Sequence, residues 1–587
     1  MSRVKPNLVL VLTDDQGYGD LGLHGNADLE TPRLDELGRA SIRMDAFHCT
    51  PVCAPTRASL LTGRDFLRTG VWHVHGGRDF LNPEETTMAQ MLKDQGYRTG
   101  MMGKWHSGKT HAYLPYHRGF EEAWMATLYE HQHNEMDHNG ERVQTEGWTT
   151  EVITDLAIDF IHTHQAEPFF LYVPYLAPHE PWYAPERYID KYRQKGLSDS
   201  LSTVYGMIEQ VDENVGRIRD ALEEAGLLED TIFLFLSDNG PIAAASNMPD
   251  LTDEEMSLRN PPRSRGNKGT IWDHGTHVPC LISWPGRLKP RVEAEMAHVT
   301  DLVPTLLDFM GVPLPQGNLP LDGQSLRALL EKQETLGERL FYNATHETAW
   351  TGKTHEWDVL KDRNHIRFDL QDCNLSVRNH RYKFVPGTEG DGLYDTVADP
   401  RERHNLAQEH PEMCSFMREK LASWYQELLA SGRSHQIAVF FIGYPGETET
   451  TIPTYAPIAV TGHVTPGSHG THHWLEPGDS QQMAVEVMET AWYEIGVRAE
   501  VCKPGTSMAV SIGTQSWITE LNEEWTSLGS FPLSEGRDVL SMELVNVPPG
   551  PGEAVRFRYP LDGLVVRRVT PDQDRLNTAA KLPASPD

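Results

Sequence analysis

Cysteine is scarce in this chain, which has 6 cysteines among 587 residues. They are Cys49, Cys53, Cys280, Cys373, Cys414 and Cys502. Cysteines so few and so widely spaced argue against a disulfide framework and against a cysteine-rich zinc site. The fold must therefore depend on hydrophobic cores, and a hydrophobic content of 39% over this length allows two or three structural units.

Basic residues are also few, since 52 Lys and Arg stand against 84 Asp and Glu, a formal net charge of −32. Such an acidic balance argues against a nucleic-acid partner, because the protein would repel phosphates. An anionic substrate would be repelled at long range in the same way. An enzyme acting on such a substrate needs a local positive pocket within this acidic surface.

Long apolar runs are missing, so no apolar segment of the sequence is long enough to span a membrane. The first seven residues, MSRVKPN, show no signal-peptide pattern and pass directly into an apolar segment typical of a core strand. We therefore expect no membrane partner and a cytoplasmic location, or a periplasmic one if a leader was removed.

Short, continuous apolar runs occupy residues 7–12, 168–174 and 231–236, and each ends in polar or small residues. Continuous rather than alternating hydrophobicity is typical of strands buried on both faces of a parallel sheet. Residues 205–222 show apolar positions at helical spacing between two such runs. This alternation predicts an α/β fold with a mostly parallel sheet flanked by helices, whose ligands bind at the carboxyl ends of the strands.

The chain divides by pattern into three expected domains. Residues 1–339 carry the α/β pattern, and residues 340–435 form a smaller α+β subdomain that ends in a helical segment. From 436 to 587 the segments alternate or are rich in β-formers, with Pro and Gly clusters between them. This last part is expected to be an appended antiparallel β domain, a sandwich.

Oxygen-bearing side chains follow two of the apolar runs. Asp14 and Asp15 come after the first run, and Asp238 and Asn239 come after the third. Each pair alone is more often a turn, but here both pairs follow buried-type strands, in a chain that also carries the cysteine-containing segment CAPTRASLLTGR at residues 53–64. Hard oxygen donors without a nearby Cys or His set suit Ca²⁺ or Mg²⁺.

Cys53 begins the segment CAPTRASLLTGR, in which residues 56–61 are expected to be helical. A single cysteine is most often a small buried hydrophobe. The alternative is a nucleophilic thiolate, because a position before a helix N-terminus lowers a thiol pKa. Arg57 lies one helical turn further along, so its guanidinium can reach the same pocket.

Lys104 and His106 lie in the string GKWH, directly after the strand-like residues 98–102. On extended backbone a Lys-x-His pair places both side chains on one face. Lysine binds anionic oxygens, and histidine transfers protons near neutral pH. The chain has 27 histidines, however, so any single one is more often structural.

Two further residues complete the set of candidates. His179 stands between Pro178 and Pro181, in a rigid loop that suits a general acid. Lys268 has glycines nearby on both sides, which let the backbone approach an anion closely. The histidine-rich run from residue 131 to residue 138 is interpreted as a solvated loop, with a pocket lining as the alternative.

The segment from Cys53 to Arg64 resembles the sulfatase signature, in which the cysteine is followed by Pro two residues later and Arg four residues later. GKWH and the later string LYD resemble other segments of the same family, so the resemblance covers about residues 5–410. It implies an alkaline-phosphatase-like α/β fold. It also implies that a formylglycine-generating enzyme is a partner, which converts the Cys53 side chain to the aldehyde formylglycine.

The resemblance assigns roles to the candidates. Asp14, Asp15, Asp238 and Asn239 would bind a divalent cation, usually Ca²⁺ with Mg²⁺ as the alternative, and the modified Cys53 would add an oxygen. The hydrated aldehyde would attack the sulfur of a sulfate monoester, which is an aryl, alkyl or carbohydrate sulfate. Arg57 would stabilise the modified residue, Lys104 and Lys268 would hold sulfate oxygens, His179 would protonate the leaving alcohol, and His106 would assist sulfate release.

Other interpretations remain open. A phosphonate or phosphate ester hydrolase could use the same site, and an unmodified Cys53 could act with His106 or His179 as base. A non-catalytic carbohydrate-binding protein is a third hypothesis, in which tryptophans of the last domain stack on sugars, although most such tryptophans are core. That domain is also a reasonable surface for a homo-oligomer.

His277 stands where the family usually has Arg, and with His274 it is a candidate for shaping the substrate pocket. A cluster of His469, His472 and His473 is a candidate metal site or, more often, a loop.

Overall fold

The computed structural model describes residues 5–346, 373–387, 390–433, 437–466, 470–522, 524–557 and 563–570. Its largest sheet has ten strands in the order β11-β2-β10-β9-β1-β8-β4-β5-β6-β7. The centre, from β9 to β5, is parallel, and antiparallel pairs flank it on both sides. In chain order the strands are β1 Asn7–Thr13, β2 Ile42–Met44, β4 Arg98–Gly103, β5 Glu122–Met125, β6 Glu135–His138, β7 Glu141–Gln144, β8 Phe169–Pro174, β9 Thr231–Ser237, β10 Cys280–Ser283 and β11 Arg291–Glu293.

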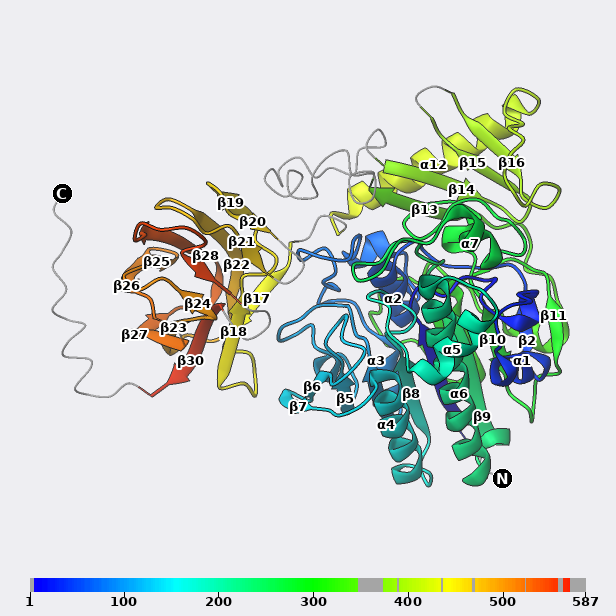
Figure 1. The fold of residues 1–587 in the computed structure, drawn as a ribbon, viewed down its shortest axis with the longest axis horizontal. Helices are drawn as coiled ribbons and strands as arrows, with labels where there is room; N and C mark the ends of the chain where they lie inside the picture. Colours follow the sequence, from blue (N-terminus) through cyan, green and yellow to red (C-terminus); the bar gives the residue numbers. More distant parts are fainter. Residues whose placement is uncertain are drawn as a thin grey trace.

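Helices cover both faces of this sheet (Figure 1). Leu8, Leu10 and Leu12 of β1 belong to one core, whereas Val9 and Val11 belong to the other. The first core is closed by α2 Cys53–Thr62, α3 Met88–Asp94, α9 Leu302–Met310 and α10 Arg327–Lys332. The second is closed by α1 Pro32–Arg39, α4 Thr149–Thr163, α5 Glu186–Gln194 and α6 Asp199–Glu224. Because both faces of β1 are buried, its apolar run is continuous rather than alternating.

The longest helix, α6, contains the helical pattern expected at residues 205–222 and extends it at both ends. It begins after Ser198, whose side chain accepts a hydrogen bond from the Leu201 amide and caps the helix. The helix expected at residues 56–61 lies within α2, which begins at Cys53 itself. Cys53 is therefore the first residue of a helix rather than a residue that precedes one.

A second sheet is a four-stranded antiparallel meander, β13-β14-β15-β16. It consists of Phe341–His346, Cys373–Arg378, Tyr382–Val385 and Gly392–Asp395, and α12 Pro411–Ser431 packs against it. Phe66, Leu67 and Trp72 of the first part of the chain join the same core. This unit is therefore packed onto the α/β part beside the segment that follows α2.

Two further sheets form a sandwich at the C-terminal end, seen in yellow to red in Figure 1. One has the order β17-β22-β28-β25-β26, with β19 also paired to β22, and the other is β18-β30-β23-β27. Most pairs are antiparallel as expected, but β17 and β22 run parallel. The strands are β17 Val439–Ile442, β18 Glu449–Pro453, β19 Ala459–Thr461, β22 Ser480–Val487, β23 Ala491–Ala499, β25 Ser507–Ile512, β26 Gln515–Glu520, β27 Glu524–Leu533, β28 Gly536–Asn546 and β30 Gly563–Val569.

Each of the four larger sheets lies within one of the three expected domains, while the exact boundaries at 339/340 and 435/436 stay predictions. Short elements complete the described chain: β3 Phe47–His48, β12 Ala297–His298, β20 Thr465–Pro466, β21 Thr471–His472, β24 Val501–Cys502, β29 Val555–Arg556, α7 Asp253–Leu258, α8 Asp273–Thr276, η1 Gly22–His24, η2 Phe66–Thr69, η3 Pro115–His117, η4 Leu228–Asp230 and η5 Val299–Asp301. Within the described residues, no helix is both long and apolar enough to cross a membrane.

The C-terminal candidates can be placed in part. Trp474 is fully buried in the sandwich core, so it cannot stack on a sugar, whereas Trp492, Trp517 and Trp525 are half-buried. His473 contacts the Thr465 hydroxyl at 2.6 Å. His469 lies outside the described residues, so the suggested histidine cluster stays a prediction.

Candidate active site

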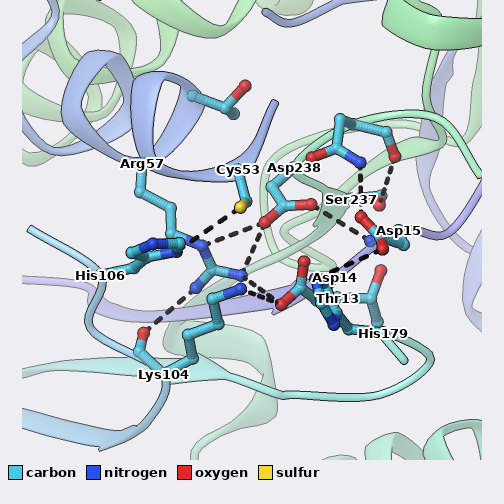
Figure 2. A network of polar contacts seen from close by, with 12 residues as sticks. Thr13, Asp14, Asp15, Cys53, Arg57, Lys104, His106, His179, Ser237 and Asp238 are labelled. Carbon is cyan, nitrogen blue, oxygen red and sulfur yellow. Dashed lines mark hydrogen bonds and ion pairs between the residues drawn. The ribbon is translucent and has the colours of Figure 1, made fainter. Parts of the chain in front are cut away.

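The candidate residues meet where the central parallel strands end (Figure 2). Asp14 follows β1, Asp238 follows β9, and Lys104 follows β4. Backbone hydrogen bonds continue the sheet past these ends: the Asp238 amide donates to Thr13 O at 3.1 Å and the Lys104 amide donates to Pro174 O at 2.7 Å. The side chains are therefore placed by the sheet itself and are held as rigidly as its strands.

Four oxygen-bearing side chains form the floor of the site. Asp14, Asp15, Asp238 and Asn239 are all fully buried. The Asp15 amide donates to Asp238 Oδ1 at 3.2 Å, and Asn239 Nδ2 donates to Asp15 Oδ1 at 2.7 Å. Asp14 Oδ1 and Asn239 Oδ1 have no hydrogen-bond partner, although both are buried. Spare acceptor oxygens of this kind are costly unless a donor or a cation satisfies them, so the donor set fits a hard cation such as Ca²⁺ or Mg²⁺.

The two carboxyls at the centre of this floor are electrostatically unequal. Burial and the neighbouring Asp14 raise the pKa of Asp238 to about 7. Burial would also raise the pKa of Asp14, but the positive charges of Lys104 and Arg57 outweigh it and hold this pKa well below its usual range. Asp14, Asp238 and Cys53 each present one ligand atom within 4.8 Å of the others. A divalent cation at that point would relieve the repulsion between the carboxylates.

Arg57 fixes the geometry between α2 and the strand ends. Its Nε and Nη2 donate to Asp238 Oδ2 at 3.0 and 2.7 Å, and its Nη1 donates to Lys104 O at 3.1 Å. The guanidinium is fully buried. Burial alone would lower the pKa of Arg57, but Asp238 raises it above its usual value, so the side chain stays charged. One residue therefore ties together the helix of Cys53, a carboxylate and the backbone of Lys104.

Two lysines reach the same floor from different segments. Lys104 Nζ pairs with Asp14, and Lys268 Nζ lies 2.6 and 2.8 Å from the two carboxylate oxygens of Asp15. Burial would lower the pKa of Lys268, but Asp15 and other negative groups raise it above its usual value. Both ammonium groups are therefore paired with the carboxylates that a cation would also use.

Cys53 faces this cluster from the first turn of α2, and its Sγ lies 3.5 Å from His106 Nδ1. Burial raises the pKa of the Cys53 thiol to about 11. This direction contradicts the lowered thiol pKa of the thiolate alternative, because desolvation outweighs the effect of Lys104 and Lys268. At neutral pH the unmodified side chain is a protonated thiol and a weak nucleophile.

The two histidines differ in which nitrogen faces the site. His106 Nε2 lies 2.8 Å from Val74 O, so it is the donor there and Nδ1 is the acceptor that faces Cys53. His179 Nδ1 donates to Glu180 O at 2.5 Å, which leaves Nε2 at 3.7 Å from Asp15 Oδ2. Burial lowers the pKa of both rings, with Lys104 adding to the effect at His106 and Lys268 at His179. Both rings are therefore neutral in this arrangement.

Tyr129 and His75 lie near the site and were not among the candidates. The Tyr129 ring lies 5.3 Å from that of His179, and its hydroxyl is 3.3 Å from His75 Nε2. No local pattern distinguishes Tyr129 or His75, because each is brought to the site by a loop whose path depends on the tertiary fold. His131 is buried beside His179, so for this residue the interpretation as a solvated loop is wrong and the alternative of a pocket lining fits.

His274 and His277 lie at the edge of the site. His274 Nδ1 contacts Gly266 O at 3.0 Å, in the loop that carries Lys268. The His277 ring stacks on Tyr18 at 4.0 Å and on His48 at 5.1 Å, and its Nε2 contacts Asp45 O at 2.9 Å. His274 therefore supports the Lys268 loop, while a role of either residue in the substrate pocket stays a prediction.

Two family models match the chain. The family described as "Sulfatase" matches residues 6–312, and the family described as "N-sulphoglucosamine sulphohydrolase, C-terminal" matches residues 266–427. Neither match extends into the C-terminal sandwich.

Curated relatives match about two thirds of the chain. Arylsulfatase A from Homo sapiens is 31% identical over 446 residues, which cover 68% of this chain and 83% of the relative. N-acetylgalactosamine-6-O-sulfatase from Bacteroides thetaiotaomicron is 26% identical over 494 residues, which cover 71% of this chain and 93% of the relative.

Solved structures share the fold. Ps i-CgsB in complex with k-i-k-neocarrahexaose has a TM-score of 0.62 at 23% identity and covers 72% of this chain and 93% of its own. A structure in complex with its substrate D-glucosamine-2-N,6-O-disulfate has a TM-score of 0.56 at 18% identity, with coverage of 73% and 99%. The alkaline-phosphatase-like α/β fold expected from the sequence is thereby confirmed.

Proposed function

The chain belongs to the sulfatase family and hydrolyses sulfate esters, and from this premise we propose that Cys53 acts as formylglycine beside a bound Ca²⁺. The observation that carries the proposal is the position of Cys53. It begins α2, lies beside three buried carboxyls and shares its helix with Arg57. A formylglycine-generating enzyme is then a required partner. We propose a sulfate monoester of an aryl, alkyl or carbohydrate alcohol as the substrate.

The raised thiol pKa supports the modification. With a pKa of about 11, the Cys53 thiol is almost entirely protonated at neutral pH and is a poor nucleophile. The hydrated aldehyde supplies an oxygen nucleophile and a second hydroxyl through which sulfate can be released. His106 Nδ1 is a neutral acceptor 3.5 Å from the Sγ atom at this position, so it is placed to take a proton from a group there.

The oxygen donors are placed to bind a cation, and the two lysines are placed to bind the sulfate group of the substrate. Asp14, Asp15, Asp238 and Asn239 would hold Ca²⁺, with Mg²⁺ as the smaller alternative, and Asp14 Oδ1 and Asn239 Oδ1 are the spare ligands. The bound cation supplies positive charge to the ester oxygens and to the nucleophile. Lys104 and Lys268, which now pair with Asp14 and Asp15, could then turn part of their charge toward the sulfate group.

His179 is placed to donate the proton that the leaving alcohol needs. Its Nδ1 hydrogen is held by Glu180 O, so the exchangeable position is Nε2, which faces the site. The free ring has a lowered pKa because burial and Lys268 disfavour its charged form. An anionic ester bound beside Lys268 would counter this effect and raise the pKa of His179, so that substrate binding itself favours the protonated acid.

Comparison of two classes of ester tests the proposal. The protein is produced together with a formylglycine-generating enzyme, saturated with Ca²⁺, and assayed with matched aryl sulfate and aryl phosphonate or phosphate esters. We expect the sulfate ester to be hydrolysed with the higher kcat/KM. Negligible turnover of the sulfate ester with efficient turnover of the phosphonate or phosphate ester would show that the protein is a phosphonate or phosphate ester hydrolase instead. Sulfated sugars and alkyl sulfates in the same assay then define the alcohol.

A further inference from the structure

A second group of metal-ligating side chains lies outside the active site, where the α/β part meets the C-terminal sandwich. His111 and His117 come from the segment between β4 and β5, and Glu447 lies in the loop between β17 and β18. One ligand atom from each lies within 4.8 Å of the others. The cluster contains two imidazoles and one carboxylate, unlike the oxygen-rich active site.

The distances within this cluster fit a metal site. His111 Nδ1 and His117 Nε2 each lie 3.5 Å from the same atom, Glu447 Oε1. Both nitrogens are buried and have no hydrogen-bond partner. In a tetrahedral site with metal–ligand bonds of about 2.0–2.1 Å, neighbouring ligand atoms lie about 3.3–3.5 Å apart. An ion between the three atoms would therefore satisfy both orphaned nitrogens at once.

The surrounding residues hold the rings in place. The Tyr444 ring stacks on His111 with centroids 6.1 Å apart and meets His117 edge-on at 4.7 Å, and Tyr116 contacts His117 at 4.6 Å. These aromatic contacts restrict the orientation of both rings, and a fixed ring orientation is typical of metal-bound histidines.

The cluster lies close to the surface. The side chains of His111 and His117 are 14% and 16% exposed and that of Glu447 is 29% exposed, so solvent is near enough for a water to complete the site. Two imidazoles, one carboxylate and a water form a common ligand set of zinc.

We propose that His111, His117 and Glu447 bind a Zn²⁺ ion. The ion joins the loop that follows Lys104 and His106 to the β17–β18 loop, so it links an active-site segment to the C-terminal sandwich. This link adds to the hydrogen bonds of the Tyr455 hydroxyl with Asp79, at 3.0 Å to each carboxylate oxygen, in the same contact region. Its role is structural, since none of the three residues contacts the candidate catalytic groups described above.

Zinc titration of the full-length protein tests this site. The chelator-treated protein is first saturated with Ca²⁺, so that the active-site oxygens are occupied, and is then titrated calorimetrically with Zn²⁺. We expect the unaltered protein to bind one Zn²⁺ ion that His117→Gln does not bind, and Glu447→Gln to bind it at least about tenfold more weakly. Zn²⁺ should raise the unfolding temperature of the unaltered protein and leave that of His117→Gln unchanged.

A matched control is His463→Gln in the same sandwich, because His463 also lies near two carboxylates, at 3.2 Å from Asp479 and 3.5 Å from Glu476, but within the described part of the chain it belongs to no three-ligand group. It should bind Zn²⁺ like the unaltered protein. Retained hydrolysis of an aryl sulfate by His117→Gln shows that this variant is folded. Co²⁺ in place of Zn²⁺ should give a tetrahedral visible spectrum that is absent from His117→Gln. Equal Zn²⁺ stoichiometry and affinity in the unaltered protein and both site variants, or no Zn²⁺ binding by the unaltered protein, would overturn the proposal.

Discussion

At the scale of single residues, the site depends on groups that no substitute reproduces. Arg57 makes a paired contact with one oxygen of Asp238 and a further contact with the Lys104 backbone, all without access to water. Only a planar guanidinium offers donors in these directions, whereas an ammonium is a point charge on a flexible stem. The geometry, and not merely the positive charge, is what Arg57 contributes.

Replacement of Arg57 by Lys should therefore damage both activity and stability. We expect kcat/KM for an aryl sulfate to fall by about 100-fold or more, because the Cys53 helix loses its tie to Asp238. The free energy of unfolding should fall by about 3 kcal/mol, because a buried carboxylate loses hydrogen bonds. Steady-state kinetics and urea unfolding measure the two effects. The control is Arg219→Lys, because Arg219 pairs with Glu36 on the surface. It should change neither kcat/KM nor the free energy of unfolding. An equal effect of both substitutions would contradict this role of Arg57.

At the scale of elements, the sheet could be predicted from the sequence because strands buried on both faces appear as continuous apolar runs. Residues 7–12 and 231–236 fall within β1 and β9, which pair in parallel with register Asn7 opposite Thr231. The polar residues at both ends therefore meet, as the rule for carboxyl ends of parallel strands requires. Tyr129 and His75 could not be predicted in this way, because loop paths are set by distant packing. The lowered Cys53 pKa of the thiolate alternative failed for a related reason, since burial is a tertiary property.

The turn after β9 offers a test at this scale. A Cβ at Gly240 would lie 1.8 Å from His274 O, so Gly240→Ala must push the Asp238–Asn239 turn away from α8, which follows the Lys268 loop. We expect weaker Ca²⁺ binding, loss of most aryl sulfatase activity and a cost of about 1–3 kcal/mol in the free energy of unfolding.

Gly226→Ala is the control for this turn, since Gly226 has φ +69° and open space around its Cβ position, remote from the site. It should lower stability through backbone strain and leave Ca²⁺ affinity and KM unchanged. Unchanged Ca²⁺ affinity in Gly240→Ala would show that the turn does not depend on this close approach.

At the scale of the whole molecule, a chain with a net charge of −32 must attract an anion to one point. The sequence led us to expect a positive pocket, and Arg57, Lys104 and Lys268 do converge. Each of them, however, already pairs with a carboxyl of the same site, which the sequence could not show. On the proposed function, a divalent cation would take over these carboxylates and leave the positive groups for an anion, so cation binding and anion binding are expected to be coupled.

The most direct test of the account is the mass of the peptide that contains Cys53, measured on protein whose sulfate release from an aryl sulfate has been assayed in parallel. We predict that active protein carries the aldehyde, that activity rises in proportion to the modified fraction, and that Cys53→Ala releases no sulfate above background. An intact, alkylatable Cys53 thiol in fully active protein would contradict the account, because a thiol with a pKa of about 11 would then be the working nucleophile.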